Sequence, residues 1–282
     1  MPELPEVEVA ARNLRRWGVG KTIRAVRTDP RAARLFRPGS AKAPLDLAGA
    51  RLREIRRIGK NLLLTLTRQR KPLGVWSHLG MTGKWLRRAA AEAPPPATRV
   101  ELDLAGGARL CYVDHRMFGR FRLVPGAHFE ALPEIADLGP DPLVDGIDVT
   151  AFAARLARLQ LPIKVALLDQ TLLAGVGNIQ ASESLFRAGI DPRRPARSLA
   201  RAEVRRLATA IRRSIDFTLR TFAAEGADGG GADIGYVEEG QTPNPFLVYG
   251  RAGKRCKRGG KGTIVRIIQA GRATFFCPEC QA

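Results

Sequence analysis

The first apolar residues of the chain recur at helical spacing. Val7, Leu14 and Trp17 return every three or seven positions, and Pro5 suits the first turn of a helix. Glycines follow directly after this run and do not favour a longer helix. The pattern therefore predicts one amphipathic helix over residues 5–17.

From about residue 22 to residue 124 the pattern changes to short runs in which apolar and polar residues alternate. Glycines, prolines and polar clusters separate these runs, and the segment 89–98 has the composition of a surface loop. Such a succession of short strands is typical of an antiparallel β-sandwich or barrel. The predicted strands are 22–26, 52–57, 61–66, 99–104, 109–113 and 120–124.

The C-terminal half is helical before it returns to strands. Residues 125–148 are rich in Pro, Gly and Asp and indicate a linker, and a helical pattern then extends from 149 to about 224. Two strand-like runs close the chain beside cysteines, which is typical of a β-hairpin ribbon. The predicted helices are 151–160, 164–173, 178–188 and 201–223, and the predicted strands are 263–268 and 273–276.

The chain carries a formal net charge of +20 over 282 residues, which implies an anionic partner such as nucleic acid or an anionic membrane surface. No run approaches the roughly 18 apolar residues of a membrane span, and the N-terminus lacks the pattern of a secretory signal. Segment 187–220 holds ten arginines against three acids, and segment 251–282 holds eight basic residues against one acid. This concentration favours nucleic-acid binding by these two segments over a merely solvated surface. The four cysteines suit a reducing cytosol.

Three of the cysteines lie near the C-terminus. Cys277 and Cys280 have the two-residue spacing of a zinc knuckle, and Cys256 precedes them. Gly259 stands where a second knuckle would place its cysteine. The sequence therefore predicts three of four zinc ligands, and two alternatives stay open: zinc with an outside ligand, or a hairpin that folds without metal.

The glycine-lined turn Gly175–Asn178 lies between two predicted helices. A helix that starts at such a turn presents backbone N–H groups and the positive end of its dipole, which together favour a phosphate. An ordinary corner between two helices would have the same pattern, so this segment alone does not decide between a phosphate site and a simple turn.

The N-terminus offers a nucleophile. Removal of Met1 before the small residue Pro2 would leave a secondary amine, and an α-amino group titrates near 8. Attack of this amine on the anomeric carbon of a sugar gives a cationic iminium, which makes elimination of neighbouring phosphates feasible. Glu3 and Glu6 lie close enough to move protons, although acids at a helix start also simply favour its dipole.

Several motifs occur together and in order: PELPEVE at 2–8, HLGMTG at 78–83, DHRMFG at 114–119, GVGNIQASESLFRAGIDP at 175–192 and the cysteine tail. As a set they resemble the formamidopyrimidine-DNA glycosylase family, bacterial enzymes that excise oxidised purines from DNA. The resemblance covers essentially the whole chain.

The resemblance implies an α+β fold with an N-terminal helix and antiparallel β-sandwich, a helix–two-turn–helix domain and a zinc-ribbon-like C-terminal hairpin. The domains implied are a catalytic sandwich over 1–131, a linker over 132–148, the helix–two-turn–helix domain over 149–228, and a lesion loop with the hairpin over 229–282. The partner implied is double-stranded DNA with oxidised bases. We expect a monomer in the bacterial cytoplasm, associated with the nucleoid and not with a membrane.

Matched motif by motif, the resemblance also implies the roles of single residues. Pro2 would form the Schiff base, Glu3 would be the acid that opens the sugar and expels the base, and Glu6 would support them. Met81, Arg116 and Phe118 would fill the gap that an extruded base leaves, with Arg116 toward the orphaned partner base. The residues expected at DNA phosphates are Lys60, Lys164, Asn178 and Arg272, and those expected at zinc are Cys256, Cys277 and Cys280.

The chain departs from the family pattern at Met117, Gln180, Gly259 and in the glycine-rich segment 226–235. The activity that the resemblance implies is that of a bifunctional glycosylase and AP lyase acting on 8-oxoguanine and formamidopyrimidines, with β,δ-elimination. Two alternatives are an oxidised-pyrimidine glycosylase of the same superfamily and a non-enzymatic protein that binds damaged DNA.

Overall fold

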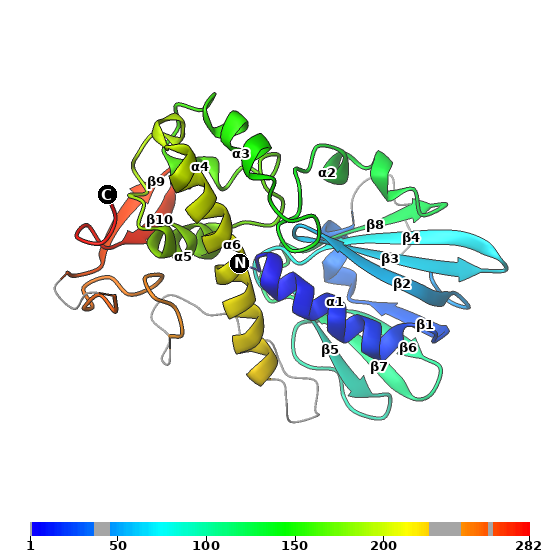
Figure 1. Cartoon of the computed structure of the whole chain (residues 1–282). Helices are drawn as coiled ribbons and strands as arrows, with labels where there is room; N and C mark the ends of the chain where they lie inside the picture. The colour runs from blue at the N-terminus through cyan, green and yellow to red at the C-terminus, as the bar shows by residue number, and fades with distance from the viewer. Residues whose placement is uncertain (1, 37–45, 226–243, 259–261) are drawn as a thin grey trace. The chain divides into compact units, whose positions relative to one another are not determined.

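The computed structural model describes residues 2–36, 46–225, 244–258 and 262–282 (Figure 1). The chain divides into two compact units, and the described residues of the first lie within Met1–Ala136 and Phe222–Tyr236, those of the second within Asp137–Thr221 and Val237–Ala282. The glycine-rich segment 226–235 and Gly259 lie outside the described residues. Among the described residues, no helix combines the length and apolar composition that a membrane crossing requires.

The first unit opens with helix α1, Leu4–Gly18, one residue longer at each end than the sequence pattern predicts. Its apolar stripe, which includes Val7, Leu14 and Trp17, is buried. Eight strands follow, with short 3₁₀ turns at Pro30–Leu35 and Phe129–Ala131 and a one-turn helix α2 at Pro133–Ala136. The strands are β1 Ile23–Thr28, β2 Arg51–Ile58, β3 Asn61–Arg68, β4 Lys71–His78, β5 Lys84–Ala89, β6 Thr98–Leu104, β7 Ala108–Val113 and β8 Arg120–Pro125.

These strands make two antiparallel four-stranded sheets, in the orders β1-β6-β7-β5 and β2-β3-β4-β8. One hydrophobic core joins both sheets to α1: it contains Leu14 of the helix, Leu64 of one sheet, and Leu102 and Tyr112 of the other. Two sheets that share a core in this way are a β-sandwich, as the sequence predicts.

The described part of the second unit contains three helices, most of a fourth, and a hairpin. Helices α5, Asn178–Ala188, and α6, Arg201–Glu225, lie where the sequence pattern predicts them. Helix α3, Val149–Leu156, begins two residues before and ends four residues before the predicted helix 151–160. The predicted helix 164–173 is wrong in extent, because α4 comprises only Ile163–Ala166 and turns follow. Asp169 accepts a hydrogen bond from the N–H of Thr171, a local contact that competes with helix propagation. A 3₁₀ turn, Ala196–Ser198, precedes α6.

Strands β9, Val265–Gln269, and β10, Arg272–Phe276, pair antiparallel as the C-terminal hairpin. A small core of Phe186, Val248, Ile264 and Phe275, together with cysteines, packs the hairpin against α5. The predicted α+β fold class is confirmed: an N-terminal helix, a sandwich of antiparallel sheets, a helical region and a C-terminal hairpin with a cysteine cluster.

Candidate active site and nucleic-acid interface

The start of α1 is a buried acidic cap. Glu3 occupies the N-cap position, its backbone N–H donates to Glu6 Oε2 at 3.0 Å, and its own side chain accepts from the N–H of Glu6. Pro2 is buried, and Glu3 and Glu6 are 1 % and 2 % exposed. The capping box therefore fixes two carboxyl groups next to Pro2, at the positive end of the helix dipole.

The carboxyl group of Glu6 has an unusual acidity. Burial, and secondarily the negative charge of Glu3, raises the pKa of Glu6 from 4.5 to about 7. A carboxyl group that titrates near neutral pH can both give and take a proton under physiological conditions. This property suits a group that moves protons beside a nucleophile.

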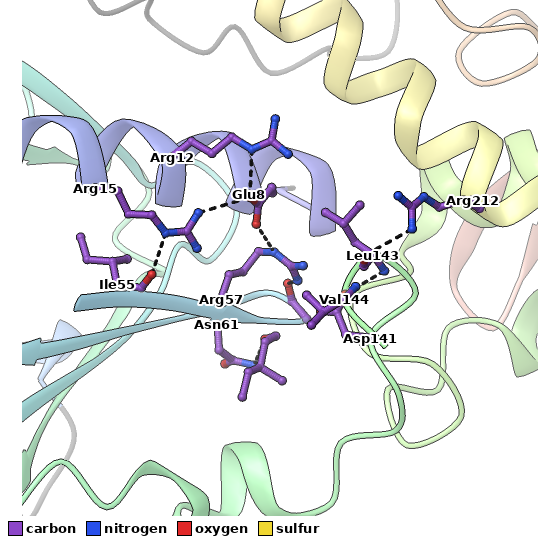
Figure 2. Close-up of polar contacts among 12 residues, drawn as sticks. Glu8, Arg12, Arg15, Ile55, Arg57, Asn61, Asp141, Leu143, Val144 and Arg212 are labelled. Carbon is purple, nitrogen blue, oxygen red and sulfur yellow. Dashed lines mark hydrogen bonds and ion pairs between the residues drawn. The ribbon is translucent and has the colours of Figure 1, made fainter. Parts of the chain in front are cut away.

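Glu8, two residues after Glu6 on α1, connects the helix to the turn that carries Lys60. Burial alone would raise the pKa of Glu8, but hydrogen bonds from Arg57 and Arg12 outweigh it and lower the pKa. Arg57 Nε donates to Glu8 Oε2 at 2.8 Å, and Arg57 Nη1 donates to the carbonyl of Gly59 at 2.9 Å (Figure 2). The backbone next to Lys60 is thereby held against α1 through one buried guanidinium.

Asn61 fixes the other side of the same turn. Its side chain donates to the carbonyl of Ile58 at 3.1 Å and accepts from the indole N–H of Trp76 at 3.0 Å. Lys60 itself is partly exposed on this braced turn. Such a turn is suited to hold a phosphate.

The three residues expected to enter the DNA lie on two neighbouring loops. Met81 is 36 % exposed between β4 and β5, and Phe118 is 43 % exposed between β7 and β8. The Arg116 guanidinium lies 4.9 Å from the centroid of the Phe118 ring. Exposed apolar side chains beside a cation are the groups that wedge into a base stack.

Asp114 joins these two loops. It is completely buried and accepts from the Thr82 hydroxyl at 2.6 Å and from the N–H groups of Met117 and Gly119 at 3.0 and 2.8 Å. Gly80, at φ +66°, lies so close to the backbone of Phe118 that any side chain there would collide with it. The loops of Met81 and Phe118 are thus one rigid structure.

In the second unit, Asn178 and Arg272 lie close together. Asn178 begins α5, and its side chain donates to the carbonyl of Ala273 at 2.8 Å, one residue after the exposed Arg272. Gln170 shapes the preceding turn, because its side chain accepts from the N–H of Gly175 at 2.9 Å and donates to the carbonyl of Val176 at 2.9 Å. The N-terminus of α5 therefore lies beside the start of the strand that carries Arg272, an arrangement suited to phosphate binding.

Lys164 has a different environment from the other predicted phosphate ligands. It lies on α4 and is 0 % exposed, and its backbone N–H donates to the carbonyl of Pro192 at 3.4 Å. An ammonium group in the interior cannot reach a phosphate unless this part of the unit moves. The DNA contact of Lys164 stays a prediction.

Glu183 is a structural anchor that the sequence motifs did not reveal. This buried residue of α5 accepts from three consecutive N–H groups, those of Leu247, Val248 and Tyr249, at 2.8–3.0 Å. It thereby fixes the segment that enters the cysteine hairpin. Glu183 and Leu247 are 64 positions apart in the chain, so sequence spacing gives no signal of the contact.

The three C-terminal cysteines form a cluster. The Sγ atoms of Cys256, Cys277 and Cys280 all lie within 4.8 Å of one another, and those of Cys256 and Cys280 are 3.7 Å apart. Two thiolates on a tetrahedral zinc, each at about 2.3 Å, lie about 3.8 Å apart, so this spacing fits the metal. Within the described residues the cluster offers three ligands of the four that a closed zinc site uses.

The comparisons with known proteins agree along the whole chain. A family model of the formamidopyrimidine-DNA glycosylase N-terminal domain matches residues 1–121, and a model of the H2TH domain of the same enzymes matches residues 138–225. Formamidopyrimidine-DNA glycosylases of Desulfitobacterium hafniense and Cereibacter sphaeroides are 39 % and 40 % identical, with 100 % of both chains covered.

Solved structures agree with these relatives. The Lactococcus lactis Fpg in complex with DNA containing an abasic site has a TM-score of 0.83 and 30 % identity over 99 % of each chain. The MutM (Fpg) protein of Thermus thermophilus has a TM-score of 0.80 and 37 % identity, with 99 % of this chain and 98 % of that one covered. The chain therefore belongs to the formamidopyrimidine-DNA glycosylase family.

Proposed function

We propose that this protein is a bifunctional DNA glycosylase of base excision repair that removes oxidised purines, 8-oxoguanine and formamidopyrimidines, and then cleaves the DNA strand. The observation that carries the proposal is the capping box of Glu3 and Glu6, which holds two buried carboxyl groups beside Pro2. Family membership supports the same activity. Relatives carry the enzyme's name, and one solved structure contains Fpg with DNA bearing a formamidopyrimidine lesion.

The chemistry starts at Pro2. After removal of Met1 its secondary amine attacks C1′ of the damaged nucleotide, and the bond from C1′ to the base breaks. The departing base takes up the proton that the Pro2 nitrogen loses, and Glu3 donates a proton to O4′, which opens the sugar and leaves an iminium between the amine and C1′. Loss of a proton from C2′ expels the 3′ phosphate, and a second elimination expels the 5′ phosphate. Glu6, with its pKa of about 7, relays protons between these steps.

The other predicted residues bind DNA. Lys60, on its braced turn, holds phosphates near the lesion, and Asn178 and Arg272 hold phosphates in the second unit. Met81 and Phe118 replace the extruded base in the stack, which offsets an unstacking cost of a few kcal/mol. Arg116 hydrogen-bonds the orphaned base, which we expect to be cytosine. The protein acts as a monomer in the bacterial cytoplasm, on the nucleoid.

Zinc belongs to the same proposal. Cys256, Cys277 and Cys280 hold Zn²⁺ as thiolates, and the metal stabilises the hairpin that carries Arg272. A hairpin fixed in this way loses less entropy when Arg272 binds a phosphate.

Substrate class is tested by comparing duplexes that contain 8-oxoguanine or thymine glycol. We expect faster cleavage of the 8-oxoguanine duplex, with phosphate at both ends of the gap. Faster cleavage of thymine glycol would assign the chain to the oxidised-pyrimidine class. Binding of both duplexes without cleavage would leave only a damaged-DNA-binding protein.

A further inference from the structure

A pocket lined by arginines lies in the second unit, within the two arginine-rich segments 187–220 and 251–282 but at none of the single residues expected at DNA phosphates. It has a volume of about 410 Å³ and is lined by Arg187, Arg205, Arg206, Arg213 and Arg258, together with Thr209 and Ala210. Arg187 stands nine residues after Asn178 on α5, so about 14 Å of helix separates it from the turn expected to hold DNA phosphate.

The acids nearest the pocket are engaged elsewhere. Glu203 lies 3.9 Å from Arg206, but it forms shorter ion pairs with Arg194, at 2.7 and 2.9 Å. Glu183 lies 3.9 Å from Arg187 while its carboxylate accepts from three backbone N–H groups. The positive charge of the pocket is therefore poorly neutralised by the protein.

The pKa of Arg187 reflects the positive charges that surround it. Burial, and then the positive charges of Arg258, Arg213 and Arg220, lowers the pKa of Arg187 despite the nearby Glu183. Its Nε atom is buried and has no hydrogen-bond partner among the described residues. An anion in the pocket would reduce the repulsion among the guanidinium groups and could accept a hydrogen bond from Arg187 Nε.

Two of the guanidinium groups are held in place before any ligand binds. Arg258 lies 4.8 Å from the centroid of the Phe186 ring and donates to the carbonyl of Arg187 at 2.8 Å. Arg187 lies 5.1 Å from the centroid of the Phe217 ring. Stacking on aromatic rings reduces the entropy that these side chains lose on binding.

We propose that this arginine pocket binds an oligophosphate, either the triphosphate group of a free nucleotide or inorganic tripolyphosphate. Guanidinium groups match phosphate oxygens in pairs, and five of them around one recess provide more charge than a single phosphate needs. The volume is that of a small-molecule site. A DNA duplex is a wide convex rod, so it would present single backbone phosphates to this recess, whereas an oligophosphate could contact several of its arginines at once.

The test is calorimetric titration of the full-length protein with tripolyphosphate in about 150 mM KCl, where long-range attraction is screened. The variant Arg205→Ala/Arg213→Ala removes two exposed arginines of the pocket. The variant Arg201→Ala/Arg212→Ala removes the same charge from the same helix outside the pocket. We expect saturable binding of one anion, weakened at least about tenfold by the pocket variant and less than about threefold by the control.

A parallel titration with ATP distinguishes the two sources of the oligophosphate, a free nucleotide and inorganic tripolyphosphate. Equal affinity for ATP and tripolyphosphate would show that the phosphates alone are recognised, and clearly tighter ATP binding would make the nucleotide the ligand. An equal loss of tripolyphosphate affinity in the pocket variant and the control variant would overturn the proposal. So would a pocket variant that bound lesion duplex much more weakly than the control variant, because the pocket would then be part of the DNA surface.

Discussion

Glu8 of α1 and Arg57 of β2 form a buried ion pair, with 2.8 Å between Arg57 Nε and Glu8 Oε2 (Figure 2). The Arg57 side chain is 1 % exposed and also donates to the carbonyl of Gly59. One guanidinium thus connects the helix that directly follows Pro2 and Glu3 with the turn that carries Lys60.

Loss of this guanidinium should be costly. Arg57→Met leaves Glu8 buried without its main partner, and we expect the free energy of unfolding to fall by about 3 kcal/mol or more. Arg12→Met is the matched control, because Arg12 also binds Glu8 at 2.9 Å but its side chain is 54 % exposed. We expect it to cost less than about 1 kcal/mol. Urea denaturation measures both, and equal losses would refute the role assigned to Arg57.

Glu6 should make stability depend on pH. Because folding raises the pKa of Glu6, its contribution is fully present below about 4.5 and is lost as the pH rises through about 7. Glu6→Gln removes this titration. Relative to the wild type, the variant should therefore gain stability between pH 5 and pH 8, by about 3 kcal/mol at most.

Denaturation curves at the two pH values provide the measurement. Glu130→Gln is the control, because the Glu130 side chain is 71 % exposed and no such gain is expected there. A stability difference between Glu6→Gln and wild type that does not change with pH would contradict the buried, proton-binding carboxyl.

Phe118 should matter for activity on duplex DNA and little for folding. Its side chain is 43 % exposed, so Phe118→Ala should change the free energy of unfolding by less than about 1 kcal/mol. Excision from a duplex should slow about tenfold, because the Phe118 ring no longer offsets part of the cost of unstacking the damaged base. A tenfold change in rate corresponds to about 1.4 kcal/mol. Excision from a single-stranded lesion oligonucleotide should slow less.

Val19→Ala is the control for Phe118, because Val19 is 39 % exposed in the same unit but lies in no DNA-binding motif. The wedge assignment fails if Phe118→Ala slows excision equally on single-stranded and duplex substrates.

Cys280→Ser should release zinc. We expect about one zinc per wild-type chain, far less in the variant, and a lower melting temperature both for the variant and for wild type treated with a chelator. Cys111 lies buried in the sandwich, so Cys111→Ala should leave the zinc content unchanged. A folded, active wild type with almost no zinc, measured by atomic emission, would show that the hairpin does not need the metal.

Elements with strong periodicity could be predicted from the sequence, and elements stabilised by distant contacts could not. Helices α1, α5 and α6 have long apolar stripes and lie where the pattern predicts them. Strand β4 was not predicted, because Pro72 and Gly74 interrupt its alternation, yet it pairs with both β3 and β8.

The site shows the same division. The motifs pointed to Pro2 and Phe118, whose proposed roles depend on their own side-chain or backbone chemistry. They gave no role to Arg57 or Glu183, whose partners lie 49 and 64 positions away. Gln180, a departure from the family pattern, bonds Ser214 and Thr218 of α6 at 2.8 and 2.9 Å, a role that only the packing of α5 on α6 explains.

Borohydride trapping tests the central claim most directly, because reduction converts an iminium between Pro2 and C1′ into a stable covalent bond. Protein from which Met1 has been removed should form a covalent adduct with an 8-oxoguanine duplex, and Pro2→Gly should lose or greatly reduce it. Arg12→Ala, as a control on the same helix, should retain it. No adduct with the processed wild type, or an adduct unchanged in Pro2→Gly, would contradict catalysis by Pro2.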